Sequence, residues 1–371
     1  MGRFRDLGLR VGLLPPGPLN AITDVDGVRV GVETLIHGDG PLETGRGPVR
    51  TGVTVVVPHE AIARAPVFAG CHRLNGNGEL TGLEWVRESG QLTTPIAITN
   101  THSVGVVRDA LVGDDAGRHG DATSYWSLPV VGETYDGALN DINGMHVRGE
   151  HVRAALAAAS DGPVPEGNVG GGTGMICHEF KGGTGTASRV VEAGTVGALV
   201  QANHGRRERL TVDGVPIGTE IPVSEVPSAW DQEERVSSAG AGSIIVVLAT
   251  DVPMLPHQLE RVAQRAGLGI ARAGGAGEHS SGDLFIAFST ANRGRLESFK
   301  AGGSERPFEV EMIPDAAISD VFWAAIEATE EAIMNALVAA DTMAGRDGIT
   351  AHRLPHDRLL EVMERYNRGP R

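Results

Sequence analysis

The sequence predicts an α/β or layered α+β fold, and three observations support this prediction. Short runs rich in β-branched residues alternate with segments of helical periodicity along the whole chain, which is typical of packed layers of sheet and helix. Several of these runs are apolar almost throughout, which indicates strands covered on both faces. The chain has 371 residues and 52 glycines, so it is long enough for a large core and should contain many tight turns or close backbone contacts.

Five segments are predicted to be strands, because they combine apolar and β-branched residues. They are, in chain order, GVTVVVP (52–58), TPIAITN (94–100), TVGALVQAN (195–203), SIIVVLAT (243–250) and DLFIAFST (283–290). The segment 223–242, just before the fourth strand, has little periodicity. We expect a loop there, with a domain break as the alternative.

Four segments have the apolar spacing of helices. They are SVGVVRDALV (103–112), HVRAALAAA (151–159), LPHQLERVAQRAG (255–267) and the alanine-rich run 319–343. The third is expected to end at Gly267 as its C-cap, and the fourth is expected to stop at Gly345. Their apolar faces consist of Leu259, Val262, Ala263 and Ala266 in the third and of Val321, Ala325, Ala328 and Ala332 in the fourth.

Charge and cysteine content narrow the expected partners and compartment. The formal net charge of -15 is the opposite of what phosphate binding requires, so neither a nucleic acid nor an anionic membrane is expected as a partner. The two cysteines, Cys71 and Cys177, are too few for a disulfide framework and are expected to be core thiols in a reducing compartment. Since no apolar segment is long enough for a signal sequence or a membrane span, the expected location is the cytoplasm.

No cofactor or metal is expected, because the corresponding motifs are missing from the sequence. The glycine clusters 168–175 and 181–188 match neither a P-loop nor GxGxxG; we interpret them as tight turns, with a glycine-lined wall beside a substrate site as the alternative. The 13 histidines form no HExxH, no HxH and no His/Cys cluster at ligand spacing, although a serine triad with a distant histidine stays open. GxSxG is absent around Ser243, and a lone cysteine such as Cys177 is more typical of packing than of catalysis.

One junction carries a residue pair suited to nucleophilic catalysis. In AGAGSIIVVLAT (239–250), Ser243 follows Gly242 and begins an apolar strand. If the bond before the serine breaks, the new α-amine, with a reference pKa of about 7.7–8.0, can act as base for the hydroxyl of the same residue. The glycine tolerates strained dihedral angles and leaves its carbonyl unshielded. A plain turn before a buried strand is the alternative interpretation.

A second polar group opens the fifth predicted strand. In HSSGDLFIAFSTAN (279–292), Ser281 and Asp283 are two residues apart, so both side chains are expected on one face of the strand. A carboxylate near an α-ammonium would orient it, and the hydroxyl between them could relay a hydrogen bond. A Ser or Asx turn at the start of a strand is the alternative.

Two further segments carry groups suited to acyl transfer. VVGETYDGALNDING (130–144) contains Tyr135, whose phenol can donate to an oxyanion, and Glu133, whose carboxylate can receive a substrate ammonium; a solvated turn is the alternative. In QANHG (201–205), Asn203 ends a predicted strand, where its amide is suited to an oxyanion or, alternatively, to capping a turn.

Six motifs resemble the DmpA-like family of self-processing aminopeptidases, which includes D-aminopeptidase/esterase and β-peptidyl aminopeptidase members. They are GSIIVVLATDVPM, HSSGDLFIAFSTAN, ETYDGALNDINGMHV, TVGALVQANHG, GPLNAITDVDGVRVG and NGNGELTGLEWVRESG. They follow one another in the family's order and extend over nearly the whole chain.

The resemblance implies a precursor, one domain over 1–371, that cuts itself between Gly242 and Ser243. The implied products are an α chain of residues 1–242 and a β chain of residues 243–371. They would stay together in a four-layer αββα sandwich, similar to the Ntn-hydrolase fold but with a distinct topology. The implied assembly is a homo-oligomer of such αβ heterodimers.

The resemblance also implies roles for individual residues. Ser243 would be the nucleophile with its own α-amine as base, and Ser281 and Asp283 would be the supporting hydroxyl and carboxylate. Tyr135 and Asn203 match positions of substrate contact and oxyanion stabilisation. Glu133 as the group that binds the substrate amine is a separate expectation, drawn from its charge.

The expected activity is release of N-terminal residues from short peptides, amides or esters with a free amine, through an acyl-enzyme on Ser243. One alternative is an acyltransferase, since the related ornithine acetyltransferase family shares the fold but uses a threonine nucleophile. The other is a non-catalytic protein that keeps the fold, in which Gly242 and Ser243 form a plain turn.

Overall fold

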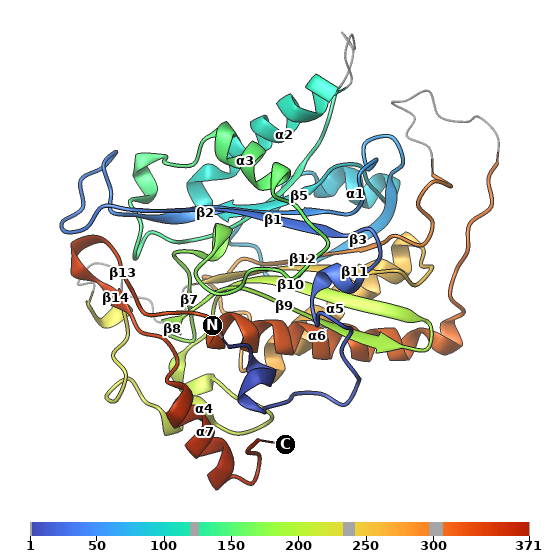
Figure 1. Cartoon of the computed structure of the whole chain (residues 1–371). Coiled ribbons are helices and arrows are strands. Elements are labelled where there is room, and N and C mark those ends of the chain that lie inside the picture. The colour runs from blue at the N-terminus through green and yellow to red at the C-terminus, as the bar shows by residue number, and fades with distance from the viewer. Residues whose placement is uncertain (1, 119–125, 233–241, 297–306, 371) are drawn as a thin grey trace.

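Two β-sheets lie face to face at the centre of the molecule, and helices cover the outer face of each (Figure 1). The computed structural model describes residues 2–118, 126–232, 242–296 and 307–370. The order of layers is α2 and α3, a four-stranded sheet, a six-stranded sheet, and α5 and α6. The expected four-layer αββα fold is therefore confirmed.

The elements follow in chain order. They are β1 (Arg29–His37), β2 (Val49–Val57), β3 (Val67–Arg73), α1 (Leu83–Ser89), β4 (Gln91–Leu92), β5 (Ile96–Asn100), α2 (Val104–Arg118), β6 (Val130–Thr134), α3 (Gly149–Ala157), β7 (Ile176–Cys177), β8 (Phe180–Lys181), β9 (Gly183–Val191), β10 (Gly194–Asn203), α4 (Ile217–Glu220), β11 (Ser243–Thr250), α5 (Pro256–Arg272), β12 (Asp283–Ser289), α6 (Ile318–Val338), β13 (Met343–Ala344), β14 (Thr350–Ala351) and α7 (His356–Arg365). Within the described residues, no helix combines the length and apolar character needed to cross a bilayer.

The strand order explains how distant segments meet. The four-stranded sheet runs β1-β2-β5-β6, and the six-stranded sheet runs β4-β3-β12-β11-β10-β9. In the larger sheet, β11 pairs antiparallel with β10 and parallel with β12. All eight residues of β11 are buried, because the strand lies inside the sheet and both faces of the sheet are covered.

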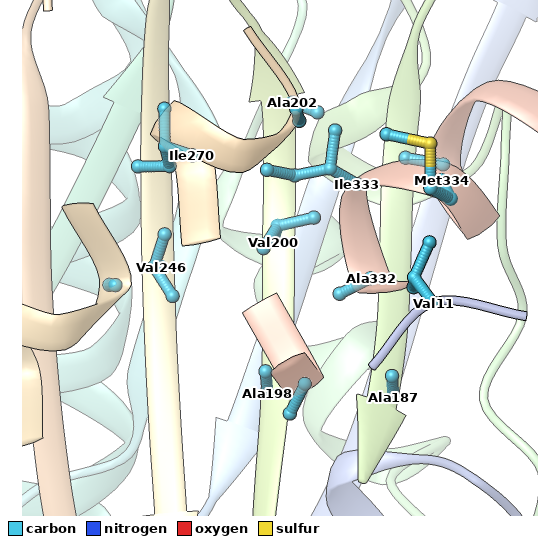
Figure 2. Close-up of a cluster of buried hydrophobic side chains, with 14 of the residues drawn as sticks. Val11, Ala187, Ala198, Val200, Ala202, Val246, Ile270, Ala332, Ile333 and Met334 are labelled. Carbon is cyan, nitrogen blue, oxygen red and sulfur yellow. The ribbon is translucent and has the colours of Figure 1, made fainter. Parts of the chain in front are cut away.

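Alternation along the strands divides the core into two parts. Ile244, Val246 and Leu248 of β11 pack toward the helices, whereas Ile245 and Val247 pack toward the four-stranded sheet. Figure 2 shows the helix side of this sheet, where Ala198, Val200 and Ala202 of β10 lie against Ala332 and Ile333 of α6. Ser243 belongs by the same alternation to the side of Ile245, between the two sheets.

All five predicted strands and all four predicted helices are present, with bounds shifted by a few residues. The predicted apolar faces of the third and fourth helices are buried. The two glycine clusters are confirmed as close backbone packing: a Cβ on Gly172 would lie 2.2 Å from the Thr184 nitrogen. Of the expected loop 223–242, residues 233–241 lie outside the described part of the chain.

Two helix ends were predicted wrongly. Helix α5 continues through Gly267 to Arg272, because Gly269 lets it approach α6, where an added Cβ would lie 2.6 Å from the Ile326 carbonyl oxygen. Helix α6 ends at Val338, seven positions before the expected stop at Gly345. Its end packs on Gly167, whose added Cβ would lie 2.3 Å from the Ala339 oxygen, so a tertiary contact ends the helix.

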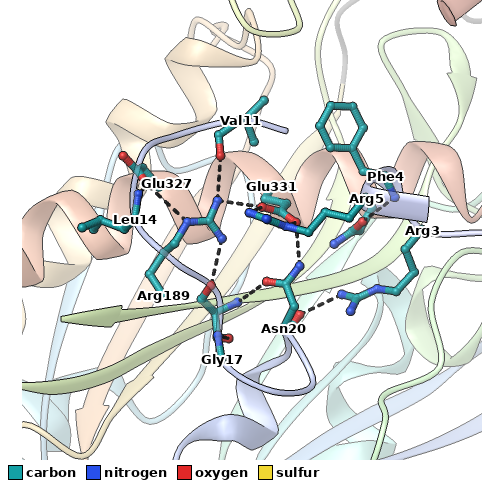
Figure 3. Close-up of polar contacts among 12 residues, drawn as sticks. Arg3, Phe4, Arg5, Val11, Leu14, Gly17, Asn20, Arg189, Glu327 and Glu331 are labelled. Atoms are coloured by element: carbon teal, nitrogen blue, oxygen red, sulfur yellow. Dashed lines mark hydrogen bonds and ion pairs between the residues drawn. The ribbon is translucent and has the colours of Figure 1, made fainter. Parts of the chain in front are cut away.

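A buried group of charges joins α6 to the N-terminal segment (Figure 3). Arg189 of β9 is fully buried, with its guanidinium 2.6 Å from Glu331 and 3.2 Å from Glu327. Glu331 also accepts from Arg5 and from Asn20, both at 2.6 Å. These carboxylates therefore have several charged or polar donors each, as buried ions require.

Candidate active site

The ends of three neighbouring strands bring the predicted site residues together. Asn203, the last residue of β10, is the direct partner of Ser243, the first residue of β11. On the other side of β11, Ile244 pairs with Asp283, the first residue of β12. Directly opposite residues of an antiparallel pair project to one face with Cβ atoms about 4.5–5.5 Å apart. Asn203 and Ser243 therefore have adjacent side chains.

The hydroxyl of Ser243 is held, and the residue before it is tightly confined. Ser243 Oγ accepts a hydrogen bond of 3.0 Å from the Gly282 N–H. A Cβ added to Gly242 would lie 1.8 Å from the Asn203 carbonyl oxygen, so only glycine fits against this strand end. The backbone before Ser243 is thus packed directly onto the residue that faces the hydroxyl.

The carboxylate of Asp283 lies beside β11 in a largely polar shell. Its Oδ1 accepts from the Ser281 hydroxyl at 2.5 Å and from the Ile244 N–H at 3.2 Å. Asn75 makes two hydrogen bonds to Asp283. Its Nδ2 donates to Asp283 Oδ2 at 3.3 Å, and its Oδ1 accepts from the Asp283 backbone N–H at 2.6 Å. Burial raises the pKa of Asp283 to about 6, against the opposing effect of these donors.

The backbone around Asn203 determines which way its amide points. Its Oδ1 accepts from the Ile176 N–H at 2.7 Å, and its Nδ2 donates to the Tyr135 carbonyl at 2.9 Å. Neither backbone group can exchange its role, so the amide cannot be flipped. One Nδ2 hydrogen is used by Tyr135, and the second can serve an oxygen beside Ser243.

A cavity of about 640 Å³ opens beside Ser243. Most of its lining residues have polar side chains, and they come from both sheets and the loops at their ends. The lining residues are Asn77, Gly78, Glu79, Thr101, His102, Glu133, Tyr135, Trp230, Gly242, Ser243 and Ser280. Glu133, Tyr135 and Ser243 thus share one cavity, large enough for a small substrate.

Glu133 is a buried carboxylate on the wall of this cavity. It accepts from the Thr101 hydroxyl at 2.5 Å and from the Glu79 N–H at 3.0 Å. Burial raises the pKa of Glu133, while these two donors and His102 lower it. A carboxylate with few solvent contacts is suited to pair with a cation that enters the cavity.

The turn after Glu133 is not solvated, contrary to the alternative considered for it. Asp136, Asn140 and Asp141 are almost fully buried, and Asn140 donates to Asp136 at 3.0 Å. Tyr135 is exposed, with 37% of its surface accessible, and it borders the cavity. The turn is therefore a rigid support for Tyr135 and for the carbonyl that holds Asn203.

Several site residues escaped the sequence analysis. Asn75 is bonded to Asp283 from 208 positions away, and Thr101 and His102 enter from the end of β5. Trp230 borders the cavity from the short 3-10 turn Trp230–Gln232. The polar run NGNG at 75–78 was a usable signal for Asn75, whereas nothing local distinguishes Thr101 or Trp230.

One group of ligand-capable side chains was not expected. Cys177, His178 and His204 are buried with possible ligand atoms within 4.8 Å of one another; Cys177 and His178 are neighbours in the sequence, and His204 follows 26 positions later. Two basic side chains lie near them: burial, with a smaller effect of Arg207, lowers the pKa of His178 to about 4, and Lys181 lies close enough to lower the pKa of the Cys177 thiol against the larger effect of burial. Such neighbours disfavour a cation, so we assign no metal to this cluster.

Comparison with known proteins places the chain among peptidases. The sequence profile of peptidase family S58 matches residues 20–351. The β-peptidyl aminopeptidase BapA of Sphingosinicella microcystinivorans is 52% identical over 99% of this chain and 93% of that protein. A solved β-aminopeptidase of Burkholderia sp. is similar with a TM-score of 0.89 and 53% identity, covering 98% of this chain and 99% of that chain. The L-aminopeptidase D-Ala-esterase/amidase of Ochrobactrum anthropi, described as a variant of the Ntn hydrolase fold, has a TM-score of 0.90 and 47% identity over 99% of both chains.

Proposed function

The chain belongs to peptidase family S58 and is a peptide-bond hydrolase of the aminopeptidase type, and from this premise we propose that Ser243 is its nucleophile and that the chain activates itself. The observation that carries the proposal is the meeting of Ser243, Asn203 and Asp283 at three adjoining strand ends beside a cavity. The hydroxyl is a nucleophile, the amide can donate to an oxyanion, and the carboxylate can orient the α-amine that would serve as the base.

Self-processing begins with attack of Ser243 Oγ on the Gly242 carbonyl carbon. The Gly242–Ser243 C–N bond breaks as the ester forms, and the serine nitrogen takes up the proton lost by the hydroxyl. Water then hydrolyses this ester, which releases the Gly242 carboxylate and restores the hydroxyl. The products are residues 1–242 and residues 243–371, which stay associated as one domain.

Turnover repeats this chemistry on a substrate. The free α-amine of Ser243 accepts the hydroxyl proton while Oγ attacks the substrate carbonyl, and the amine then delivers that proton to the leaving nitrogen or oxygen. Asn203 Nδ2 and the Tyr135 phenol donate to the oxyanion. Ser281 and Asp283 orient the α-ammonium that forms during the attack. Water completes the cycle by hydrolysing the acyl-enzyme.

The substrate is a short peptide, amide or ester with a free amine, which pairs with Glu133 in the cavity. Two of the reported relatives are named as β-peptidyl or β-aminopeptidases, which favours β-amino acyl groups, whereas a third is named for L-amino acids and D-Ala esters. The packing at Gly242 supports this preference, because a Cβ there would lie 1.8 Å from the Asn203 oxygen. A β-amino acid has an unsubstituted methylene next to its carbonyl, so it fits where an L-α-residue in the same orientation does not.

The remaining parts of the proposal concern the assembly and surroundings of the enzyme. We propose a homo-oligomer of αβ heterodimers in the cytoplasm, acting on small substrates without nucleic acid, membrane or cofactor. The net charge of -15 supports the exclusion of polyanionic partners.

Mass spectrometry of the purified protein tests self-processing. We expect two chains, residues 1–242 and residues 243–371, from cleavage between Gly242 and Ser243. Ser243→Ala should give one uncut and inactive chain of 38.8 kDa. Ser289→Ala is the matched control, since this buried serine lies at the far end of β12 and donates to the Val252 carbonyl at 2.6 Å. It should be cut normally. A fully active 38.8 kDa wild-type chain would refute the proposal.

Amide hydrolysis and acyl transfer are compared in one experiment. The p-nitroanilides of L-Ala, D-Ala and a β-homoamino acid are assayed beside transfer of an acetyl group to an amine acceptor. We expect hydrolysis, fastest for the β-homoamino acid. Acetyl transfer that outpaces hydrolysis would favour the acyltransferase, and neither reaction would favour a non-catalytic protein.

A further inference from the structure

A buried lysine lies behind the proposed oxyanion donor, outside the cavity. Lys181, in β8, has no exposed surface. Its Nζ donates to the Met175 carbonyl and to the Gly182 carbonyl, both at 2.8 Å. Among the residues that the structure describes, no carboxylate lies within ion-pair distance of Lys181. A buried amine without a counter-ion is costly, so its position calls for an explanation.

The Met175 carbonyl does not need the lysine to satisfy its hydrogen bonding. It already accepts from the Gly182 N–H at 2.9 Å. Lys181 therefore adds a second, potentially charged donor to an acceptor that has a backbone partner. We therefore consider how the second donor affects the Met175–Ile176 peptide group, to which this carbonyl belongs.

That peptide unit is directly connected to Asn203. Its carbonyl is that of Met175, and its N–H is that of Ile176, which donates to Asn203 Oδ1 at 2.7 Å. The same Asn203 amide bonds to the Tyr135 carbonyl through Nδ2 at 2.9 Å. An unbroken series of hydrogen bonds thus runs from Lys181 through one peptide group and one side-chain amide to the face of Ser243.

We propose that Lys181 is a positioning residue for catalysis, which holds and polarises the Met175–Ile176 peptide and through it the amide of Asn203. A positive group at the carbonyl draws electron density from the peptide, so its N–H donates more strongly to Asn203 Oδ1. The Asn203 amide is polarised in turn, and its Nδ2 hydrogens become better donors to a developing oxyanion. This inference rests on the proposed role of Asn203.

The protonation of Lys181 is compatible with this role. Burial lowers the pKa of Lys181 to about 7, with a small opposing effect of Cys177. A neutral amine still has two hydrogens for its two carbonyl acceptors, so the geometry persists in both states. The charge adds polarisation to a support that is already in place.

A double-mutant cycle on the full-length enzyme tests the coupling. Lys181→Met, Asn203→Ala and the double variant are assayed with a p-nitroanilide substrate, and the fraction of cut chain is measured for each. Cys177→Ala is the matched control. Cys177 lies in β7, which pairs with the strand of Lys181, and the substitution shortens a buried side chain without interrupting the hydrogen-bond series. Lys181→Gln keeps an N–H donor without the charge.

We expect Lys181→Met to lower kcat by about tenfold or more with KM changed less than about twofold, since the support acts on the transition state. Asn203→Ala should lower kcat by about 10²–10³-fold, and the double variant should be no worse than Asn203→Ala alone. Lys181→Gln should be intermediate, and Cys177→Ala close to wild type.

Two results would overturn the inference, and they differ from failure of the proposed function. A folded Lys181→Met enzyme with wild-type kcat beside an impaired Asn203→Ala enzyme would refute the role of Lys181 alone. Losses that multiply in the double variant would show that Lys181 acts independently of Asn203. Full activity of Asn203→Ala would refute its role as oxyanion donor, and the inference with it.

Discussion

Replacement of Arg189 by methionine should destabilise the fold strongly, because this residue joins the N-terminal segment to α6. The guanidinium bonds to Glu331 at 2.6 Å, to Glu327 at 3.2 Å and to the Val11 carbonyl at 2.9 Å. Arg189→Met leaves both carboxylates buried with fewer partners. Removal of one partner from a buried ion pair typically costs about 3–5 kcal/mol of unfolding free energy, and we expect a loss in this range.

Urea unfolding in a Ser243→Ala background measures this cost on an uncut chain. Arg358→Met is the matched control, since Arg358 also pairs with a distant carboxylate, Glu225, but at the surface. Water and salt screen such exposed pairs, so the control should change the unfolding free energy little. Equal effects of the two substitutions, or a loss below about 1 kcal/mol for Arg189→Met, would refute the reasoning.

The pH dependence of the same experiment supplies a second check. Burial raises the pKa of Glu331, but Arg5, Arg189 and Asn20 outweigh it, so the pKa lies below its usual value in the folded state. A lowered pKa adds stability above the unfolded value, which is lost as pH falls. The difference between wild type and Arg189→Met should therefore shrink as the pH falls through about 4.5 and below.

Three other substitutions test separate parts of the structure. Asp283→Asn should abolish activity yet increase the free energy of unfolding at pH 7. Burial raises the pKa of Asp283 from 3.8 to about 6 in the folded state, so ionisation of this carboxyl lowers the unfolding free energy by up to about 3 kcal/mol as the pH rises through this window. Urea unfolding at pH 4 and pH 7 would measure this difference. Wild-type activity should fall at acid pH as this carboxylate is protonated, at a pH below about 6, because the α-ammonium of the cut chain lowers the pKa of Asp283. Gly242→Ala should leave the chain uncut in mass spectrometry, because the new Cβ meets the Asn203 carbonyl. Gln201→Leu should lower the free energy of unfolding in urea by about 1–3 kcal/mol. The substitution removes two hydrogen bonds between the sheets, from Gln201 Nε2 to the Thr99 carbonyl at 2.9 Å and to Thr134 Oγ1 at 2.8 Å. An unchanged midpoint would contradict this prediction.

Local patterns were sufficient for five strands and four helices, but they missed β1, β3, β9 and α7 and misplaced two helix ends. The strand at Ser243 is apolar throughout and is buried on both faces, as a period-free apolar run predicts. Gly267 and Gly345 are local stop signals that the structure does not use. Gly269 and Gly167 decide those ends through contacts with Ile326 and Ala339, which lie far away in the sequence. Local propensity gives way where a tertiary contact is available.

The candidate site divides in the same way. The contact between Ser281 and Asp283 is local, so their spacing was sufficient to expect it. The contact between Asn75 and Asp283 depends on β3 lying beside β12, which strand order decides and residue spacing does not. The same is true of the buried cluster around Cys177, which arises only when β7 meets β10.

In the proposed mechanism, Asn203 would connect self-processing with turnover, because its main chain packs on Gly242 and its side chain lies beside that of Ser243. Its carbonyl packs against Gly242 and leaves room only for glycine before the scissile bond. Its amide, held by Ile176 and Tyr135, faces the hydroxyl that attacks that bond. Once Gly242 is released, the same strand end is free to receive a substrate carbonyl in front of the same amide. If the chain is cut as proposed, the geometry that admits only glycine before Ser243 would also shape the acyl site of the cut enzyme, and a change at Asn203 should impair both reactions together.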